Sequence, residues 1–134
     1  MDMTPFLKWR AAIPPAALEP DSLNPHFKSE YVSLQKALGV ARTLNEETGY
    51  TIQQHTTMKD GICLLLTELV DPKGERMVLS EYPMPPWDNI HKYGACLTYI
   101  RRTQLLMVLG TAAEKDDDGN AGMPAAQKQS EGGW

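Results

Sequence analysis

The chain has 134 residues, 42% of them hydrophobic, which is the size of one domain with a modest core. It has no apolar run near the ~20 residues that span a bilayer and no signal-peptide pattern at its start, and its two cysteines, Cys63 and Cys96, lack the spacing of a zinc site or a disulfide framework. We therefore expect a cytoplasmic protein that has no contact with a membrane.

The net charge of −4 argues by itself against a nucleic-acid partner, because DNA binding relies on cations that displace counterions from phosphates. The acidity is unevenly distributed. Residues 1–113 carry 11 Lys and Arg against 12 Asp and Glu, whereas residues 114–134 carry 2 against 5. A basic stripe on the body of the protein is therefore compatible with the composition, and charge alone predicts no partner.

The amino-terminal segment predicts one short helix. Thr4 is a suitable N-cap and Pro5 fits the first helical position, and the helix is expected to continue over residues 6–13 until Pro14 stops it. Residues 16–23 are expected to form a linker.

A second helix is expected over residues 30–47. Its apolar residues recur at the 3.6-residue spacing of one helix face. They are Tyr31, Leu34, Leu38 and Ala41. Ser29 lies near the expected start and Gly49 beyond the expected end, as helix capping favours.

After the second helix the apolar period changes to two, which predicts strands. The expected strands cover residues 50–56, 62–70 and 76–82. Gly and Pro supply turn chemistry at residues 59–61 and 71–74, between these strands. We therefore expect a three-stranded antiparallel β-meander.

A long carboxy-terminal helix is expected over residues 88–109, with Asp88 as its N-cap and Gly110 after its end. Only Arg101 and Arg102 carry charge in its second half, and apolar residues surround most of the helix. Such a helix has to be covered on more than one side. The sheet can cover one side, and a neighbouring subunit is the candidate for the other.

The last segment, residues 114–134, has almost no apolar residues to bury, so we expect a disordered acidic tail. Asp116, Asp118 and Asn120 follow the start of a calcium-binding loop, but Ala121 stands where that loop needs glycine. We therefore expect no metal site and at most a weak dependence on Mg²⁺. The expected divisions of the chain are a helix and linker at 1–23, a core at 24–113 and the tail at 114–134.

No catalytic machinery is recognisable in the sequence. A P-loop needs a Gly-Lys pair, which the sequence lacks, so any work on DNA is expected to be independent of ATP. The three histidines, His26, His55 and His91, lie in different elements and are expected to be solvated or to cap helices. The carboxylates of the tail offer no pair on a rigid element, which disfavours a metal-dependent nuclease. We therefore expect a protein that is not an enzyme and has no cofactor.

Two segments are candidates for binding nucleic acid. Residues 24–31, NPHFKSEY, place a lysine and aromatic groups where a loop meets a helix, a position that favours phosphate. Arg101 and Arg102 add two guanidiniums that suit phosphate to the last helix. Each segment also has a structural interpretation, because Tyr31 could belong to the core and either arginine could pair with a glutamate of the sheet.

Together the two segments resemble the ERF (essential recombination function) family of phage annealing proteins. Residues 24–34 resemble the family's NPxFKSxYxxL opening, and residues 94–102, GACLTYIRR, resemble its GxxxTYxRR helix. Residues 109–120 match its LG…DDDGN close. The resemblance covers roughly residues 5–121.

The resemblance implies an α+β fold in which the meander packs on the long helix, and assembly of subunits into a ring or a helical filament. It also implies binding of single-stranded DNA and its annealing to a complementary strand during homologous recombination, without nucleotide hydrolysis. The positions that match the motifs and imply DNA contacts are Lys28, Tyr31, Tyr99, Arg101 and Arg102. Lys36 is a further candidate cation. The two tyrosines either stack on bases, worth ~1–3 kcal/mol per base, or pack on the sheet.

The chain departs from the family pattern in two places. Thr103 stands where the family commonly has an aromatic residue, and Lys92 and Tyr93 stand where it often has Gln. These departures bear on the exact DNA contacts. The acidity and the short tail of the chain favour an alternative interpretation, an accessory protein that oligomerises or binds host single-strand-binding or recombination proteins without annealing. The candidate partners are single-stranded DNA, further copies of the chain, a host single-strand-binding protein and a phage exonuclease, and the expected location is the host cell cytoplasm.

Overall fold

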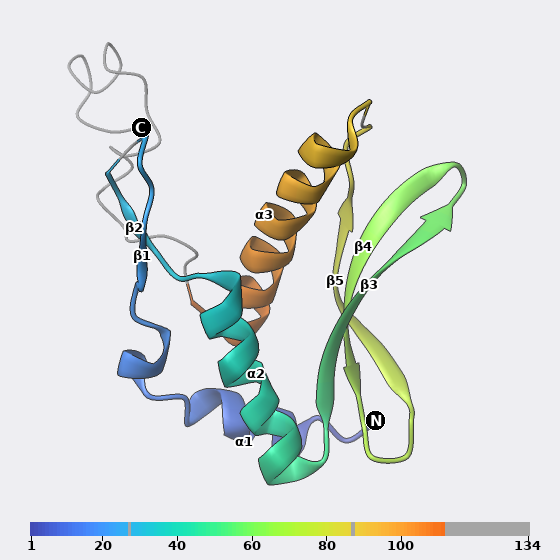
Figure 1. Cartoon of the computed structure of the whole chain (residues 1–134). Helices are drawn as coiled ribbons and strands as arrows, with labels where there is room; N and C mark the ends of the chain where they lie inside the picture. The colour runs from blue at the N-terminus through green and yellow to red at the C-terminus, as the bar shows by residue number, and fades with distance from the viewer. Residues whose placement is uncertain (27, 87, 112–134) are drawn as a thin grey trace, which may run out of the picture.

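A computed structural model describes residues 1–26, 28–86 and 88–111 of the chain. In chain order the elements are α1 (Thr4–Ala11), the 3₁₀ helix η1 (Pro15–Leu18), β1 (Ser22–Leu23), β2 (Glu30–Tyr31), α2 (Leu34–Thr48), β3 (Thr51–Lys59), β4 (Ile62–Val70), β5 (Arg76–Pro83) and α3 (Ile90–Leu109). The fold is α+β, and α3 lies between α2 and the sheet (Figure 1). The predicted acidic tail lies outside the described residues.

Strands β3, β4 and β5 form an antiparallel meander in chain order, as predicted. β3 pairs with β4 along its whole length, and Asp60 and Gly61 make the turn between them with positive φ. The register between β4 and β5 shifts at Thr67/Glu68, which is a β-bulge. Bulges increase local twist, and the β3–β4 hairpin curves away from α3 beside the amino-terminal end of this helix (Figure 1).

Helix α3 begins one residue later than a cap at Asp88 would place it. The N-cap is Asn89, which has the extended backbone of a cap and whose side chain accepts hydrogen bonds from the backbone N–H groups of His91 and Lys92 at 2.8 and 3.2 Å. The prediction of Asp88 as the N-cap was therefore wrong. Gly110 ends the helix in the left-handed conformation with φ of 86°, as predicted.

Helix α2 covers the side of α3 that faces away from the sheet (Figure 1). The larger hydrophobic cluster joins α1, α2, β4 and α3, and its most deeply buried large side chains are Phe6, Leu44, Leu69, Leu105 and Leu106. The same chain therefore covers much of this side, and contact of α3 with a neighbouring subunit stays a prediction. No helix in the described part of the chain is long and apolar enough to cross a membrane.

The interface between α3 and the sheet contains a row of polar side chains, which we call the polar seam. Gln54 of the sheet bonds both to Thr67 on the neighbouring strand and to Arg101 of α3, and Ser80 of the sheet bonds to Gln104 of α3. The Thr67 side chain is fully buried and Gln104 is nearly so. The seam separates the larger cluster from a smaller one, towards the β3–β4 turn, whose buried members are Leu65, Met84 and Ile100.

The chain just before α2 is extended and not helical. β2 (Glu30–Tyr31) pairs with β1 (Ser22–Leu23), and α2 begins only at Leu34 after Ser33, the N-cap whose hydroxyl accepts a hydrogen bond from the Lys36 N–H at 3.1 Å. The prediction of a helix from residue 30 was therefore wrong, and so was that of a plain linker over 16–23. The spacing of Tyr31 to Leu34 fits a helix face, but the cap at Ser33 sets the actual start.

Candidate functional site

The first motif forms the turn of the β1–β2 hairpin. The Asn24 N–H donates to the Ser29 carbonyl, and the Lys28 N–H donates to the Asn24 carbonyl, each at 2.7 Å. The Asn24 side chain accepts from the His26 N–H at 2.9 Å, and Lys28 has a positive φ of 53°. Asn is favoured in such turns because its side chain bonds to the backbone two residues on. The turn leaves the Lys28 side chain exposed.

Asp21 attaches this hairpin to the start of α2. Its carboxylate accepts from the Ser33 N–H at 2.8 Å and from the Ser33 hydroxyl at 2.7 Å, and the Asp21 N–H donates to the Tyr31 carbonyl at 3.1 Å. Partial loss of hydration raises the pKa of Asp21, but the hydrogen bonds from Ser33 outweigh it, so the pKa lies below its ordinary value. The carboxylate therefore stabilises the hairpin in its ionised form.

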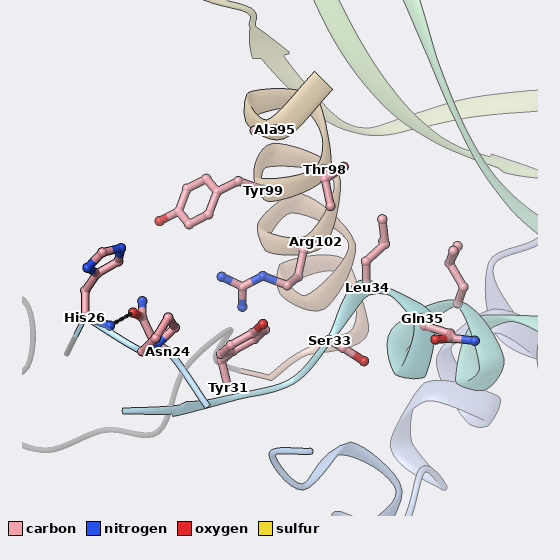
Figure 2. Close-up of a pocket in the computed structure, with 12 residues that line it drawn as sticks. Asn24, His26, Tyr31, Ser33, Leu34, Gln35, Ala95, Thr98, Tyr99 and Arg102 are labelled. Atoms are coloured by element: carbon pink, nitrogen blue, oxygen red, sulfur yellow. Dashed lines mark hydrogen bonds between the residues drawn. The ribbon is translucent and has the colours of Figure 1, made fainter. Parts of the chain in front are cut away.

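Arg102 of α3 lies beside this hairpin, between the aromatic rings of Tyr31 and Tyr99 (Figure 2). Its guanidinium carbon is 4.6 Å from the centre of the Tyr31 ring and 5.3 Å from that of Tyr99. One guanidinium nitrogen donates to the Val32 carbonyl at 3.4 Å. The side chain is only 7% exposed, and cation–π contacts of this kind are strongest where water is excluded.

These residues form one wall of a groove of about 690 Å³ between the β1–β2 hairpin, the first turns of α2 and the middle of α3 (Figure 2). The groove is lined by Asn24, Pro25, His26, Tyr31, Ser33, Leu34, Gln35, Leu38, Ala95, Thr98, Tyr99 and Arg102. Both motifs that were identified in the sequence contribute to it, although about 60 residues separate them. Folding therefore brings the two motifs into one site.

Arg101 points away from this groove, towards the sheet. Its Nε donates to the side-chain oxygen of Gln54 at 3.2 Å, and the Gln54 amide donates to the Arg101 carbonyl at 3.1 Å. Gln54 also donates to the Thr67 hydroxyl at 3.1 Å. In the described structure Arg101 therefore joins α3 to β3.

The remaining predicted cations lie at different distances from the groove. Lys28 is in the same turn as groove-lining residues, and its side chain is exposed. Lys36 does not line the groove, and its ammonium group donates to the Glu19 carbonyl at 2.6 Å. Of the six residues predicted to contact DNA, the structure gathers Tyr31, Tyr99 and Arg102 in the groove.

Several groove residues were not singled out from the sequence. His26 was expected to be incidental, yet it lines the groove, as do Leu34 and Leu38 from α2. Thr98 lines it from α3, and its hydroxyl donates to the Gly94 carbonyl at 3.1 Å. His26, Leu34 and Thr98 lie within the two motifs, so their membership of a motif was the sequence signal that could have identified them as site residues.

Glu68, a glutamate of the sheet, pairs with a histidine. Its carboxylate lies 2.6 Å from the Nε2 of His55 and accepts a hydrogen bond from the Gln53 amide at 3.1 Å. Burial raises the pKa of Glu68, but these hydrogen bonds outweigh it and hold the pKa below its ordinary value. Within the described ranges, no group of three or more His, Cys, Asp or Glu could hold a metal ion.

A known protein family matches this chain. The ERF superfamily profile matches residues 7–132, which is most of the chain. No curated protein and no solved structure matches the chain. The chain therefore belongs to the ERF superfamily, a family of phage recombination and annealing proteins.

Proposed function

We propose that this chain binds single-stranded DNA and promotes its annealing to a complementary strand, without hydrolysing a nucleotide and without acting as an enzyme. One observation carries the proposal: the two motifs of the family converge on a single groove around Arg102, between Tyr31 and Tyr99. A guanidinium, an adjacent exposed lysine and aromatic rings are the groups that proteins use to hold unpaired strands.

The proposed roles differ from residue to residue. Lys28 is exposed and neutralises a backbone phosphate, and Arg102 adds a second, fixed positive charge at the groove. Tyr31 is half-buried against Arg102 and orients its guanidinium, which gives it a positioning role. Tyr99 is exposed and available for a base. DNA contacts by Arg101 and Lys36 stay predictions from the sequence.

Self-assembly is part of the proposal, because a groove with two cations holds a strand weakly and a row of grooves multiplies that affinity. A second copy of the chain is the proposed partner. The β3–β4 hairpin supports this, since Met58 and Ile62 on either side of its turn are 66% and 51% exposed. A head-to-tail contact repeated around a circle or along a line gives a ring or a filament.

The test is fluorescence-monitored annealing of complementary single strands without ATP, over a salt series and with and without Mg²⁺. The variants are Arg102→Gln and Lys28→Ala, each expected to weaken binding of single strands. Lys28→Ala is also expected to reduce the salt slope by about 0.7, because it removes one phosphate contact. Arg101→Ala tests the predicted contact by Arg101 separately. Lys73→Ala is the matched control. Lys73 is exposed in the β4–β5 turn, at the end of the sheet away from the β1–β2 hairpin (Figure 1).

Acceleration that falls with salt, and that Arg102→Gln and Lys28→Ala reduce more than Lys73→Ala, is the expected result. Circular dichroism has to show that Arg102→Gln is folded, since Arg102 is buried. If the folded wild-type protein fails to accelerate annealing at every salt concentration of the series, the proposal is refuted and the accessory interpretation is favoured.

A further inference from the structure

The groove beside Arg102 is larger and more apolar than contact with phosphates requires. Its volume of about 690 Å³ lies within the range of roughly 300–1,000 Å³ for small-molecule pockets. Most of its lining surface is apolar, with Pro25 from the hairpin, Leu34 and Leu38 from α2, and Ala95 from α3. A phosphate against such walls would lose water without gaining hydrogen-bond donors. The walls therefore suit a ligand with a flat apolar face.

Tyr99 offers that ligand a stacking surface. Its side chain is 55% exposed although it lies in the middle of α3, and it lines the groove. The ring stands on the side of Arg102 opposite to Tyr31 (Figure 2). An exposed aromatic ring next to a cation is the usual platform for a nucleobase.

Arg102 supplies polar recognition within the same space. Contact with the Tyr31 ring at 4.6 Å and the bond to the Val32 carbonyl hold its guanidinium plane in place. Because only 7% of the residue is exposed, it is poorly placed to follow a mobile phosphate on the surface. A fixed guanidinium instead matches the acceptor edge of a base, as in pairs with the O6 and N7 atoms of guanine.

We propose that the groove takes one unpaired base of the bound strand, stacked on Tyr99 and hydrogen-bonded by Arg102, while the neighbouring phosphate contacts Lys28 outside. This inference rests on the proposed function and adds to it a site for the base itself. One base of each bound stretch would then be sheltered, and it would have to leave the groove before it could pair.

The experiment compares two single strands of equal length and charge, using the full chain. One has a mixed base sequence, and in the other every nucleotide is an abasic tetrahydrofuran residue. The dissociation constants are measured by fluorescence anisotropy at one salt concentration. The wild type is expected to bind the base-containing strand at least about tenfold more tightly, since one stacked base contributes about that much.

Variants of Tyr99 locate the effect. Tyr99→Leu keeps apolar bulk but removes the ring, and it is expected to weaken binding of the base-containing strand only, so that the ratio of the two constants falls several-fold. Tyr99→Phe is expected to keep the ratio. Lys28→Ala should weaken both strands equally, and Lys73→Ala should change neither.

The possible results separate this inference from the proposed function. Equal affinity of the wild type for both strands would overturn the base site and leave DNA binding intact. An unchanged ratio in Tyr99→Leu would also overturn it, because the bases would then contact another surface. Binding of neither strand by the folded protein would overturn the proposed function and this inference with it.

Discussion

Arg102 is a buried cation whose surroundings compensate for the loss of water. Burying a charge costs several kcal/mol unless other groups replace its hydration. Here two aromatic rings and the Val32 carbonyl surround the guanidinium. The same contacts fix the direction of the guanidinium, so the Arg102 side chain both stabilises the fold and lines the groove.

We expect Arg102→Lys to lower the free energy of unfolding by about 1–2 kcal/mol, although it keeps the charge. An ammonium group is smaller than a guanidinium and cannot contact both rings in the same way, and a desolvated cation–π contact contributes about this much. The measurement is urea denaturation of both proteins.

Arg101→Lys is the matched control, because it makes the same change at the neighbouring position, where the side chain is only half-buried and bonded to Gln54. Its expected cost is below about 1 kcal/mol. Equal costs for the two substitutions would show that the rings do not stabilise Arg102.

The motifs in the sequence identified both arginines but could not separate their roles. Successive residues of a helix point about 100° apart, so Arg101 and Arg102 had to face different sides. Choosing between the sides needs a clear apolar stripe, and α3 is apolar around most of its surface. Only the packing of α2 and the sheet decides which arginine enters the groove.

Among the elements, the meander and α3 were predictable because they are long and regular. β4 and α3 carry continuous apolar patterns, and glycines at 49 and 110 have the positive φ that ends a helix. The β1–β2 hairpin was missed, because strands of two residues have no period to detect. Its sequence signals were the Asn24-Pro25 turn and the polar residues Asp21 and Ser33, whose partnership appears only in the structure.

We expect Asp21→Asn to destabilise the protein at neutral pH but not at strongly acidic pH. The pKa of Asp21 is lowered in the folded state, so its contribution is complete above the unfolded value of about 3.9 and is lost as the pH falls through the folded pKa. Thermal unfolding of wild type and variant at pH 7 and at about pH 2 measures the difference. A difference in melting temperature that persists at low pH would contradict the prediction.

The partner residue provides the control for this prediction. In a Ser33→Ala background the Asp21 carboxylate has lost the hydrogen bond from the Ser33 hydroxyl at 2.7 Å. It keeps the hydrogen bond from the backbone N–H of residue 33. The effect of Asp21→Asn at neutral pH should therefore be smaller in this background than in the wild type. Additive effects of the two substitutions would show that the two side chains do not act together.

On the scale of the whole molecule, the surfaces proposed for DNA and for assembly lie on different sides. The groove is next to β1 and β2, whereas the β3–β4 turn projects beyond the opposite side of α3 (Figure 1). We expect Met58→Glu with Ile62→Glu to shift the protein towards smaller species in sedimentation velocity, because each buried glutamate would lose its hydration.

The control for this surface is Lys73→Glu, which alters charge in the β4–β5 turn. It should leave the distribution of species unchanged. The Met58 and Ile62 variant should also keep its affinity for a strand short enough to occupy one groove, while it loses affinity for a long strand. An unchanged distribution of species would place the assembly contact elsewhere on the molecule.

The polar seam determines how the helix can move over the sheet. A shift of α3 by one turn, about 5.4 Å, would separate Gln104 from Ser80 and Arg101 from Gln54, at about 1–3 kcal/mol for each group left buried without a partner. A purely apolar interface would carry no such penalty against sliding. The groove on one side of α3 and the β3–β4 hairpin on its opposite side therefore keep a constant separation. In an assembly, the fixed spacing between the grooves of neighbouring subunits would then set the spacing of the contacts along the flexible strand.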